Sequence, residues 1–453
     1  MSDNLIKTWQ KVLNLFSLCN LKGCLLIAVC ELLISIAIFS FFSLPSFINI
    51  LYGLSILFAL ERSRFFSFLE DKTIFEFIET SLQAAIRLVV LILALSYFFH
   101  ISLDIKTIKV IIVTFTVVNL VHFLFLYLLP QNKKRVILVG INEHTKQIIA
   151  HILNQKISCY KIEGVLTDLP EKIKEINSVP VIGSLNDINK LANKVDIIVF
   201  CLSDWRKRIN FYDLIHLKSY KIKFIDGNSF YEKIKKSILI NHFLRPSYFL
   251  FYKDHKKALT YLCIKNIAER IIALTGLIIL SPLLLIIACL IKIDSPGPIF
   301  YIQERVGLNG KVFRLIKFRS MIKDAERYTG PVFAQKDDPR ITRVGKILRR
   351  FKLDELPQLL NVLKGEMSLI GPRPERPYFV EKMREVIPYY DLRHTVKPGI
   401  TGWAQVNYKY GDSIEDGKRK LEYDLYYIRH QSLLLDLLIL LLTIKVAIFT
   451  RKY

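Results

Sequence analysis

The sequence RRFKLDELPQLLNVLKGEMSLIGPRPERP, from Arg349 to Pro377, carries the features on which the interpretation of the chain depends. Asp354 and Glu355 stand side by side in it. Four leucines then follow the i, i+3, i+4, i+7 spacing of a short helix: Leu356, Leu359, Leu360 and Leu363. Because Pro357 is tolerated only in a first helical turn, the two carboxylates are predicted at or just outside a helix N-terminus. The helix dipole there favours ionised carboxylates and a nearby phosphate.

This acidic pair lies in a basic region. Between Arg343 and Arg376 there are eight Lys or Arg residues against four Asp or Glu residues. A carboxylate pair in such surroundings suits a phosphorylated substrate and a divalent cation. An isolated Asp-Glu usually begins an ordinary surface helix, so the functional interpretation depends on the neighbouring sequence.

Composition indicates a membrane protein of two or three domains. The chain has 453 residues, is 52% apolar and carries a net charge of +24. With so much apolar sequence, this charge favours a lipid surface and phosphate-bearing substrates over nucleic acid. None of the seven cysteines forms a CxxC, so we expect reduced packing residues, with no disulfide framework and no zinc site. The N-terminus shows no removable signal peptide.

Residues 1–130 are predicted to form a membrane domain with four transmembrane helices. Apolar runs cover roughly 23–43, 45–60, 83–100 and 107–130. The basic residues near their ends fall on one side if there are four spans: Lys7, Lys11, Lys22, Arg62, Arg64, Lys72, Lys133, Lys134 and Arg135. That side is predicted to be cytoplasmic.

Residues 131–255 are predicted to form a Rossmann-like cytoplasmic domain. Buried strands are expected near 135–139, within 195–204 and within 220–227, and a helix is expected after Gly140. Asn142 and Thr145 occupy the second and third glycine places of the dinucleotide fingerprint. Because the second glycine admits a pyrophosphate, tight dinucleotide binding is disfavoured, and we interpret the domain as regulatory or as an assembly domain.

Residues 256–293 contain another long apolar run, from Ile271 to Ile291, with Ser281 and Pro282 at its middle. A proline there removes a helix hydrogen bond and bends the axis. The run alone fits two topologies, a full crossing or a helix–break–helix that enters the membrane and returns.

Residues 294–453 are predicted to form a small α/β domain. Two strands flank the Asn309-Gly310 turn, which is a strong hairpin signal, and Lys317 and Arg319 end the second strand. A Gly-rich loop is expected at 397–411 and a helix at 418–430. The tail, 433–450, contains Asp436 and Lys445, and these charges favour a helix lying on the membrane surface.

Three blocks together resemble the bacterial sugar transferase family, the monotopic polyprenyl-phosphate phosphoglycosyl transferases. They are SPGPIFYIQERVGLNGKVFRLIKFRSM, DPRITRVGKILRRFKLDELPQLLNVLKGEMSLIGPRPE and KPGITGWAQVN. The likeness runs from about residue 262 to the C-terminus. With the upstream domains, the chain resembles the long forms that act as undecaprenyl-phosphate glucose or galactose phosphotransferases and start O-antigen, capsule or exopolysaccharide synthesis.

The resemblance implies transfer of a sugar 1-phosphate from a UDP-sugar to undecaprenyl phosphate, with release of UMP. It implies that Asp354 is the nucleophile and a Mg²⁺ ligand and that Glu355 orients it. Basic family positions that bind phosphate match Lys317, Arg319, Arg349 and Arg373. Ser281 and Pro282 match the break of a re-entrant helix, which favours the returning topology. Contact with membrane lipids, a homodimer, and a catalytic domain on the cytoplasmic face of a bacterial inner membrane are also implied.

Two other functions stay open at this stage. The first is a membrane-bound nucleotide-sugar oxidoreductase or dehydratase that uses residues 131–255, where Tyr231 and Lys235 form a Tyr-x-x-x-Lys. The second is a non-catalytic scaffold for polysaccharide assembly. The altered glycine turn argues against the first, and the intact Asp354-Glu355 pair argues against the second.

Overall fold

A computed structural model describes most of the chain from residue 105 onward. The gaps in this part are 129–132, 155–159, 169, 171–172, 192–193, 203–210, 221, 241–254, 324, 326–337, 409–410, 412 and 450–453. Before residue 105, only a few helical positions between 81 and 93 are described. The chain divides into two compact units. The first is Met1–Lys134 with Gln155–Lys161, and the second is Arg135–Asn154 with Ile162–Tyr453.

In the first unit, α5 (Ile105–Leu128) covers the fourth predicted apolar run. The first two runs lie outside the described residues, and the third is described only at scattered helical positions. Among the described residues, one helix, Leu259–Asp294, is long and apolar enough to cross a membrane, and Ile108–Val117 forms a shorter apolar stretch. The four-helix transmembrane domain therefore stays a prediction.

The second unit begins with a six-stranded sheet in the order β3-β4-β2-β1-β5-β6. The strands are β1 (Lys134–Val139), β2 (Tyr160–Thr167), β3 (Glu175–Ile176), β4 (Val179–Ser184), β5 (Ile197–Phe200) and β6 (Lys223–Asp226). The pairs β1/β5, β5/β6 and β2/β4 are parallel, and the edge strand β3 pairs with β4 in the antiparallel direction. This doubly wound order confirms the predicted mixed α/β class.

Helical segments connect these strands: α6 (Glu143–Asn154), η2 (Leu185–Leu191), α8 (Phe211–Ser219) and α9 (Gly227–Lys235). They bury the apolar strands in one core, in which Ile137, Val139 and Ile198 are almost fully inaccessible. Continuous apolar strands are expected where helices cover both faces of a parallel sheet.

The turn after β1 is closed by its own side chains. The Asn142 amide donates to the Cys201 carbonyl, Thr145 N donates to Asn142 Oδ1 at 3.0 Å, and Thr145 Oγ1 donates to the Gly140 carbonyl at 2.7 Å. Gly140 itself has a φ of +97°, and a Cβ there would lie 2.3 Å from Leu202 Cγ. The groups that a pyrophosphate would approach are thus already occupied, which supports the expectation of no tight dinucleotide binding.

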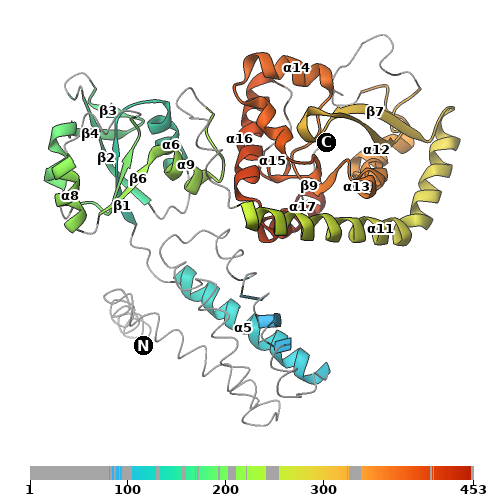
Figure 1. Cartoon of the computed structure of the whole chain (residues 1–453), viewed down its shortest axis with the longest axis horizontal. Helices are drawn as coiled ribbons and strands as arrows, with labels where there is room; N and C mark the ends of the chain where they lie inside the picture. Colours follow the sequence, from blue (N-terminus) through green and yellow to red (C-terminus); the bar gives the residue numbers. More distant parts are fainter. Residues whose placement is uncertain are drawn as a thin grey trace, which may run out of the picture. The chain divides into compact units, whose positions relative to one another are not determined.

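The next element, α11 (His255–Asp294), is a helix of 40 residues with Pro282 inside it. We expected a helix–break–helix, but the helix is continuous, because Ser281 Oγ donates to the Ile278 carbonyl at 2.8 Å near the proline. Figure 1 shows that α11 runs along one side of its domain and then turns up beside β7. A bend therefore replaces the expected break.

The remaining elements form a small domain packed on α11. They are β7 (Phe300–Val306), η3 (Leu308–Gly310), β8 (Val312–Phe318), α12 (Arg343–Arg350), η4 (Leu353–Gln358), α13 (Leu359–Lys364), β9 (Ser368–Ile370), α14 (Pro377–Val386), η5 (Tyr390–Thr395), β10 (Gly399–Thr401), α15 (Trp403–Asn407), α16 (Ile414–His430) and α17 (Leu433–Phe449). The antiparallel β7/β8 pair confirms the hairpin, with Asn309 and Gly310 at φ of 53° and 75°.

Three local expectations need correction. The predicted Gly-rich loop is mostly regular, because β10 pairs with β9 in parallel and α15 follows it. Asp436 in α17 is buried and paired, so this charge is not evidence for the expected membrane-surface helix, which stays a prediction. Cys263 and Cys289 are exposed on α11 instead of being packed inside the protein.

Candidate active site

Asp354 and Glu355 lie in the first turn of η4. Lys352 before them adopts a left-handed conformation, with φ of 54°, and so turns the chain from α12 into η4. Pro357 lies inside this 3-10 segment, and α13 begins only at Leu359. The helix after the dyad is therefore shorter than the leucine spacing predicted, and it starts later.

The hairpin is attached to this segment by Asn361, which is fully buried in α13. Its amide nitrogen donates to the Arg314 carbonyl at 2.8 Å, and its Oδ1 accepts from Ile316 N at 3.1 Å. One side chain thereby satisfies both backbone groups on the outer edge of β8. This attachment fixes Lys317, the next residue of β8, relative to η4.

Glu355 forms an ion pair with Arg373, whose Nη2 lies 2.8 Å from Glu355 Oε1. Burial acts to raise the pKa of Glu355, but Arg373 outweighs it, helped by Lys352 and Lys317, and the pKa lies below its usual value. Glu355 is therefore ionised at neutral pH. It comes from η4, whereas Arg373 lies in the loop after β9, so the pair joins two separate segments.

Asp354 differs from its neighbour. Its side chain is buried, and it makes no hydrogen bond or ion pair with any residue that the structure describes. Burial raises the pKa of Asp354, and the charge of Glu355 raises it further, against the opposing charges of Lys317, Arg349 and Arg373. A carboxylate that is unpaired and surrounded by cations has the electrostatic setting that a nucleophile for a phosphate needs.

Lys317 belongs to the same charged group. The pKa of Lys317 is lowered to about 8, mainly by burial and then by the charges of Arg305 and Arg373, against the opposing charges of Asp354 and Glu355. Its Nζ also lies 5.0 Å from the centre of the Tyr301 ring. Because this pKa lies above neutral pH, Lys317 is still positively charged there and can pair with an anionic ligand.

Arg349 contributes to this field from α12. Its charge acts on both Asp354 and Asp338, and its Nη1 is buried without a hydrogen-bond partner among the described residues. A buried unpaired guanidinium nitrogen near an unpaired carboxylate fits a site that an anionic ligand completes.

Arg319 is directed elsewhere. Its Nη1 donates to the Pro296 carbonyl at 2.9 Å, and its Nη2 donates to the Ser295 carbonyl at 2.7 Å. These carbonyls follow the C-terminus of α11, and the side chain is 5% exposed. The resemblance implied phosphate binding, but these contacts indicate that Arg319 holds the end of α11.

Two further arginines were not found from the sequence. Arg305 donates to the Pro374 carbonyl at 3.0 Å, and Arg393 donates to the Arg373 carbonyl at 3.0 Å and to Asp424 at 2.9 Å. They hold the loop that carries Arg373. The alternation of Tyr301, Gln303 and Arg305 along β7 is a signal that could have identified Arg305, since it places a polar row on one face.

The magnesium ion expected at this site stays a prediction. No group of three His, Cys, Asp or Glu side chains lies together among the described residues. Mg²⁺ often binds through one or two carboxylates and completes its shell with substrate phosphate oxygens and water. Asp354, unpaired and next to Glu355, is the carboxylate that would hold it.

Part of the chain matches a known protein family and several characterised proteins. The family model described as bacterial sugar transferase matches residues 260–450. A UDP-N-acetylgalactosamine-undecaprenyl-phosphate N-acetylgalactosaminephosphotransferase of Aeromonas hydrophila is 49% identical over 185 residues, which is 41% of this chain and 44% of that protein. A UDP-glucose:undecaprenyl-phosphate glucose-1-phosphate transferase of Escherichia coli K12 is 45% identical over 183 residues, 40% of this chain and 39% of that protein.

The exopolysaccharide production protein PSS of Rhizobium leguminosarum bv. phaseoli is 42% identical over 192 residues. The match covers 40% of this chain but 94% of that protein. By contrast, the chain matches less than half the length of the two proteins from Aeromonas and Escherichia. The family model covers the part of the chain that carries the candidate site.

Proposed function

The chain belongs to the bacterial sugar transferase family, and we propose that it transfers a sugar 1-phosphate from a UDP-sugar to undecaprenyl phosphate. UMP is the second product. The observation that carries the proposal is the buried, unpaired Asp354 carboxylate beside the Glu355–Arg373 pair. The reaction would start the synthesis of a lipid-linked O-antigen, capsule or exopolysaccharide.

Two displacements at phosphorus account for this chemistry. In the first, an Asp354 oxygen forms a bond to the sugar-bearing phosphorus while the bond from that phosphorus to the bridging oxygen breaks, and UMP leaves. In the second, an oxygen of the lipid phosphate forms a bond to the same phosphorus and Asp354 leaves as a free carboxylate. Each step conserves charge and needs no oxidant, and the carboxylate acts as a covalent nucleophile.

The surrounding cations lower the cost of bringing two anions together. Lys317 and Arg373 face the carboxylates, and Arg349 adds charge from α12. Positioning and charge stabilisation provide most of the catalysis of phosphoryl transfer. Mg²⁺ held by Asp354 would supply further neutralisation of the diphosphate. Glu355, kept in place by Arg373, orients Asp354 or the metal.

The exposed surface of α11 supports the proposed membrane topology. Apolar side chains are exposed along its length, including Ile271, Ile279 and Leu285, and α17 exposes Leu441 and Ile444. We propose that α11 enters the inner membrane, bends near Pro282 and returns, which leaves the catalytic domain on the cytoplasmic face. The lipid substrate, membrane lipids and a second copy of the chain are the proposed partners.

The oxidoreductase alternative has little support at its key residue. Tyr231 is fully buried in α9, and burial raises the pKa of its phenol. A catalytic tyrosine of that kind needs access to substrate and a lowered pKa. The hydrogen bonds that close the turn at Gly140 and Asn142 also argue against a dinucleotide-dependent oxidoreductase.

The test is UMP release by the purified full-length chain with undecaprenyl phosphate and Mg²⁺, across a panel of UDP-sugars. The panel includes UDP-N-acetylgalactosamine and UDP-glucose, the donors in the names of two relatives. We expect release with at least one donor, dependent on the lipid, and none from Asp354→Asn. No release with any donor would favour the scaffold alternative and overturn the proposal.

A further inference from the structure

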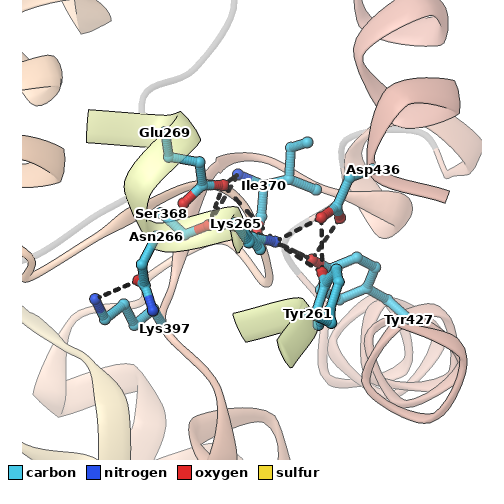
Figure 2. Close-up of polar contacts among 9 residues, drawn as sticks. All are labelled: Tyr261, Lys265, Asn266, Glu269, Ser368, Ile370, Lys397, Tyr427 and Asp436. Atoms are coloured by element: carbon cyan, nitrogen blue, oxygen red, sulfur yellow. Dashed lines mark hydrogen bonds and ion pairs between the residues drawn. The ribbon is translucent and has the colours of Figure 1, made fainter. Parts of the chain in front are cut away.

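A second cluster of charges lies buried beneath the loop that carries Arg373. It consists of Lys265 and Glu269 from α11 and Asp436 from α17, each less than a tenth exposed. Lys265 Nζ lies 3.1 Å from Asp436 Oδ2 and 3.7 Å from Glu269 Oε1. Figure 2 shows the lysine between the two carboxylates, with Tyr261 and Tyr427 beside it.

Donors from three elements converge on one backbone atom, the Ile370 carbonyl oxygen at the end of β9. Lys265 Nζ donates to it at 2.9 Å, and the hydroxyls of Ser368 and Tyr427 lie 2.8 and 3.1 Å from it. The single proton of Tyr427 is shared with Asp436 Oδ1, which lies 2.8 Å away. Glu269 in turn accepts from Ser368 Oγ at 2.7 Å. Figure 2 shows these contacts meeting around Ile370.

The Ile370 carbonyl begins the loop of the active site. Gly371 N, in the same peptide unit, donates to the Thr401 carbonyl at 2.9 Å, and Gly399 N donates to the Pro372 carbonyl at 2.9 Å. A Cβ at Gly371 would lie 2.4 Å from the Lys397 carbonyl, so the loop is packed closely against β10. Arg373 follows two residues later and reaches Glu355.

The charges in this cluster call for an explanation, because taking ions out of water costs free energy that apolar packing does not. A fully paired cluster can instead specify one geometry, since each displaced group would leave a charge unpaired. Here the group held in that geometry is a backbone carbonyl in the active-site loop.

We propose that Lys265 is a positioning residue for the transfer reaction. It holds the Ile370 carbonyl in a fixed position relative to α11 and α17, and the Ile370 carbonyl in turn positions the loop that carries Arg373. The inference rests on the proposed function. Lys265 does not reach the substrate and acts through Arg373. Because α11 and α17 also expose the apolar surfaces proposed to meet the membrane, the cluster joins the membrane-bound helices to the site.

The experiment measures kcat and KM for the UDP-sugar with full-length Lys265→Met and Lys265→Arg, each also in an Arg373→Ala background. The control is Lys292→Met, which removes an exposed lysine from the same helix. Tyr427→Phe keeps the ring and removes the hydroxyl that contacts Lys265, Asp436 and the Ile370 carbonyl, so it provides a milder test of the same cluster.

We expect Lys265→Met to lower kcat about 10- to 100-fold in the parent, as for a small displacement of a charged group. In the Arg373→Ala background the further loss is expected to be less than about twofold, because residues that act through one another are not additive. Lys265→Arg is expected to restore part of kcat, and Lys292→Met to match the parent. Tyr427→Phe should show a smaller loss with the same dependence on Arg373.

An active parent with unchanged kcat in both Lys265→Met and Tyr427→Phe would overturn this inference alone. Equal losses in the two backgrounds would also overturn it, since they indicate a purely structural contribution. If Lys265→Met does not fold, the same comparison is made with Tyr427→Phe. A loss of kcat that is equal in the parent and in the Arg373→Ala background would then overturn the inference. A parent that releases no UMP overturns the proposed function and, with it, this inference.

Discussion

Arg373 and Glu355 form an ion pair at 2.8 Å across two separate segments, the loop after β9 and the start of η4. The pair occupies one carboxylate of the dyad and leaves Asp354 without a partner among the described residues. Two adjacent acids thus have different environments. Different environments are what allow two carboxylates to take different roles.

The first prediction follows from this difference. Asp354→Asn should lower UMP release by about 10⁴-fold or more, because it removes the nucleophile, whereas Glu355→Gln should lower it by about 10- to 100-fold. Both variants should remain in the membrane fraction, and Asp354→Asn should keep the thermal midpoint of the parent. Comparable rates for Asp354→Asn and the parent would remove Asp354 as nucleophile.

The second prediction concerns pH. The pKa of Lys317 is lowered to about 8, so its positive charge is present below that pH and is lost as pH rises through it. The kcat/KM for the UDP-sugar, which reports the free enzyme, should therefore fall above about pH 8. Lys317→Arg keeps its charge, so its profile should fall at higher pH. An identical alkaline limb in that variant would exclude Lys317 as its source.

The sequence predicted those parts of the fold that have strong local signals. The Asn309-Gly310 turn requires two positive φ angles, and the hairpin forms around it. The strands β1, β5 and β6 lie in the three segments that were predicted as strands. The dyad and the basic positions Lys317, Arg349 and Arg373 were selected from motifs, and all three have charges that act on Asp354.

Other features depend on partners distant in sequence, and for that reason local patterns did not reveal them. The burial of Asp436 depends on Lys265 in α11, and the attachment of β8 depends on Asn361 in α13. Arg319 looked like a phosphate ligand because only the structure shows the carbonyls that it meets. Side chains that satisfy buried backbone groups have no periodic signature.

A third prediction tests the attachment of the hairpin. Asn361→Ala leaves a backbone N–H and a backbone C=O of β8 unpaired, and should destabilise the domain by roughly 2–5 kcal/mol. The thermal midpoint of the detergent-solubilised protein measures this loss. Asn189→Ala, which removes an exposed amide that donates to Asp213, is the control. Equal midpoints for the two variants would contradict the role of Asn361.

A fourth prediction concerns topology. Single cysteines at positions 255 and 300, in a background without the seven native cysteines, should both react only with a reagent that reaches the cytoplasmic face. Position 255 is the first residue of α11, and position 300 follows the end of that helix at Asp294. Labelling from opposite faces would show that α11 crosses the membrane completely.

The central claim is tested most directly by mass spectrometry of the purified chain after incubation with a UDP-sugar and Mg²⁺ in the absence of undecaprenyl phosphate. We predict a covalent adduct with the mass of the phosphosugar, located on the peptide that contains Asp354, released when the lipid phosphate is added and absent from Asp354→Asn. UMP release by the parent without any adduct on that peptide, at any time before the lipid is added, would contradict the account.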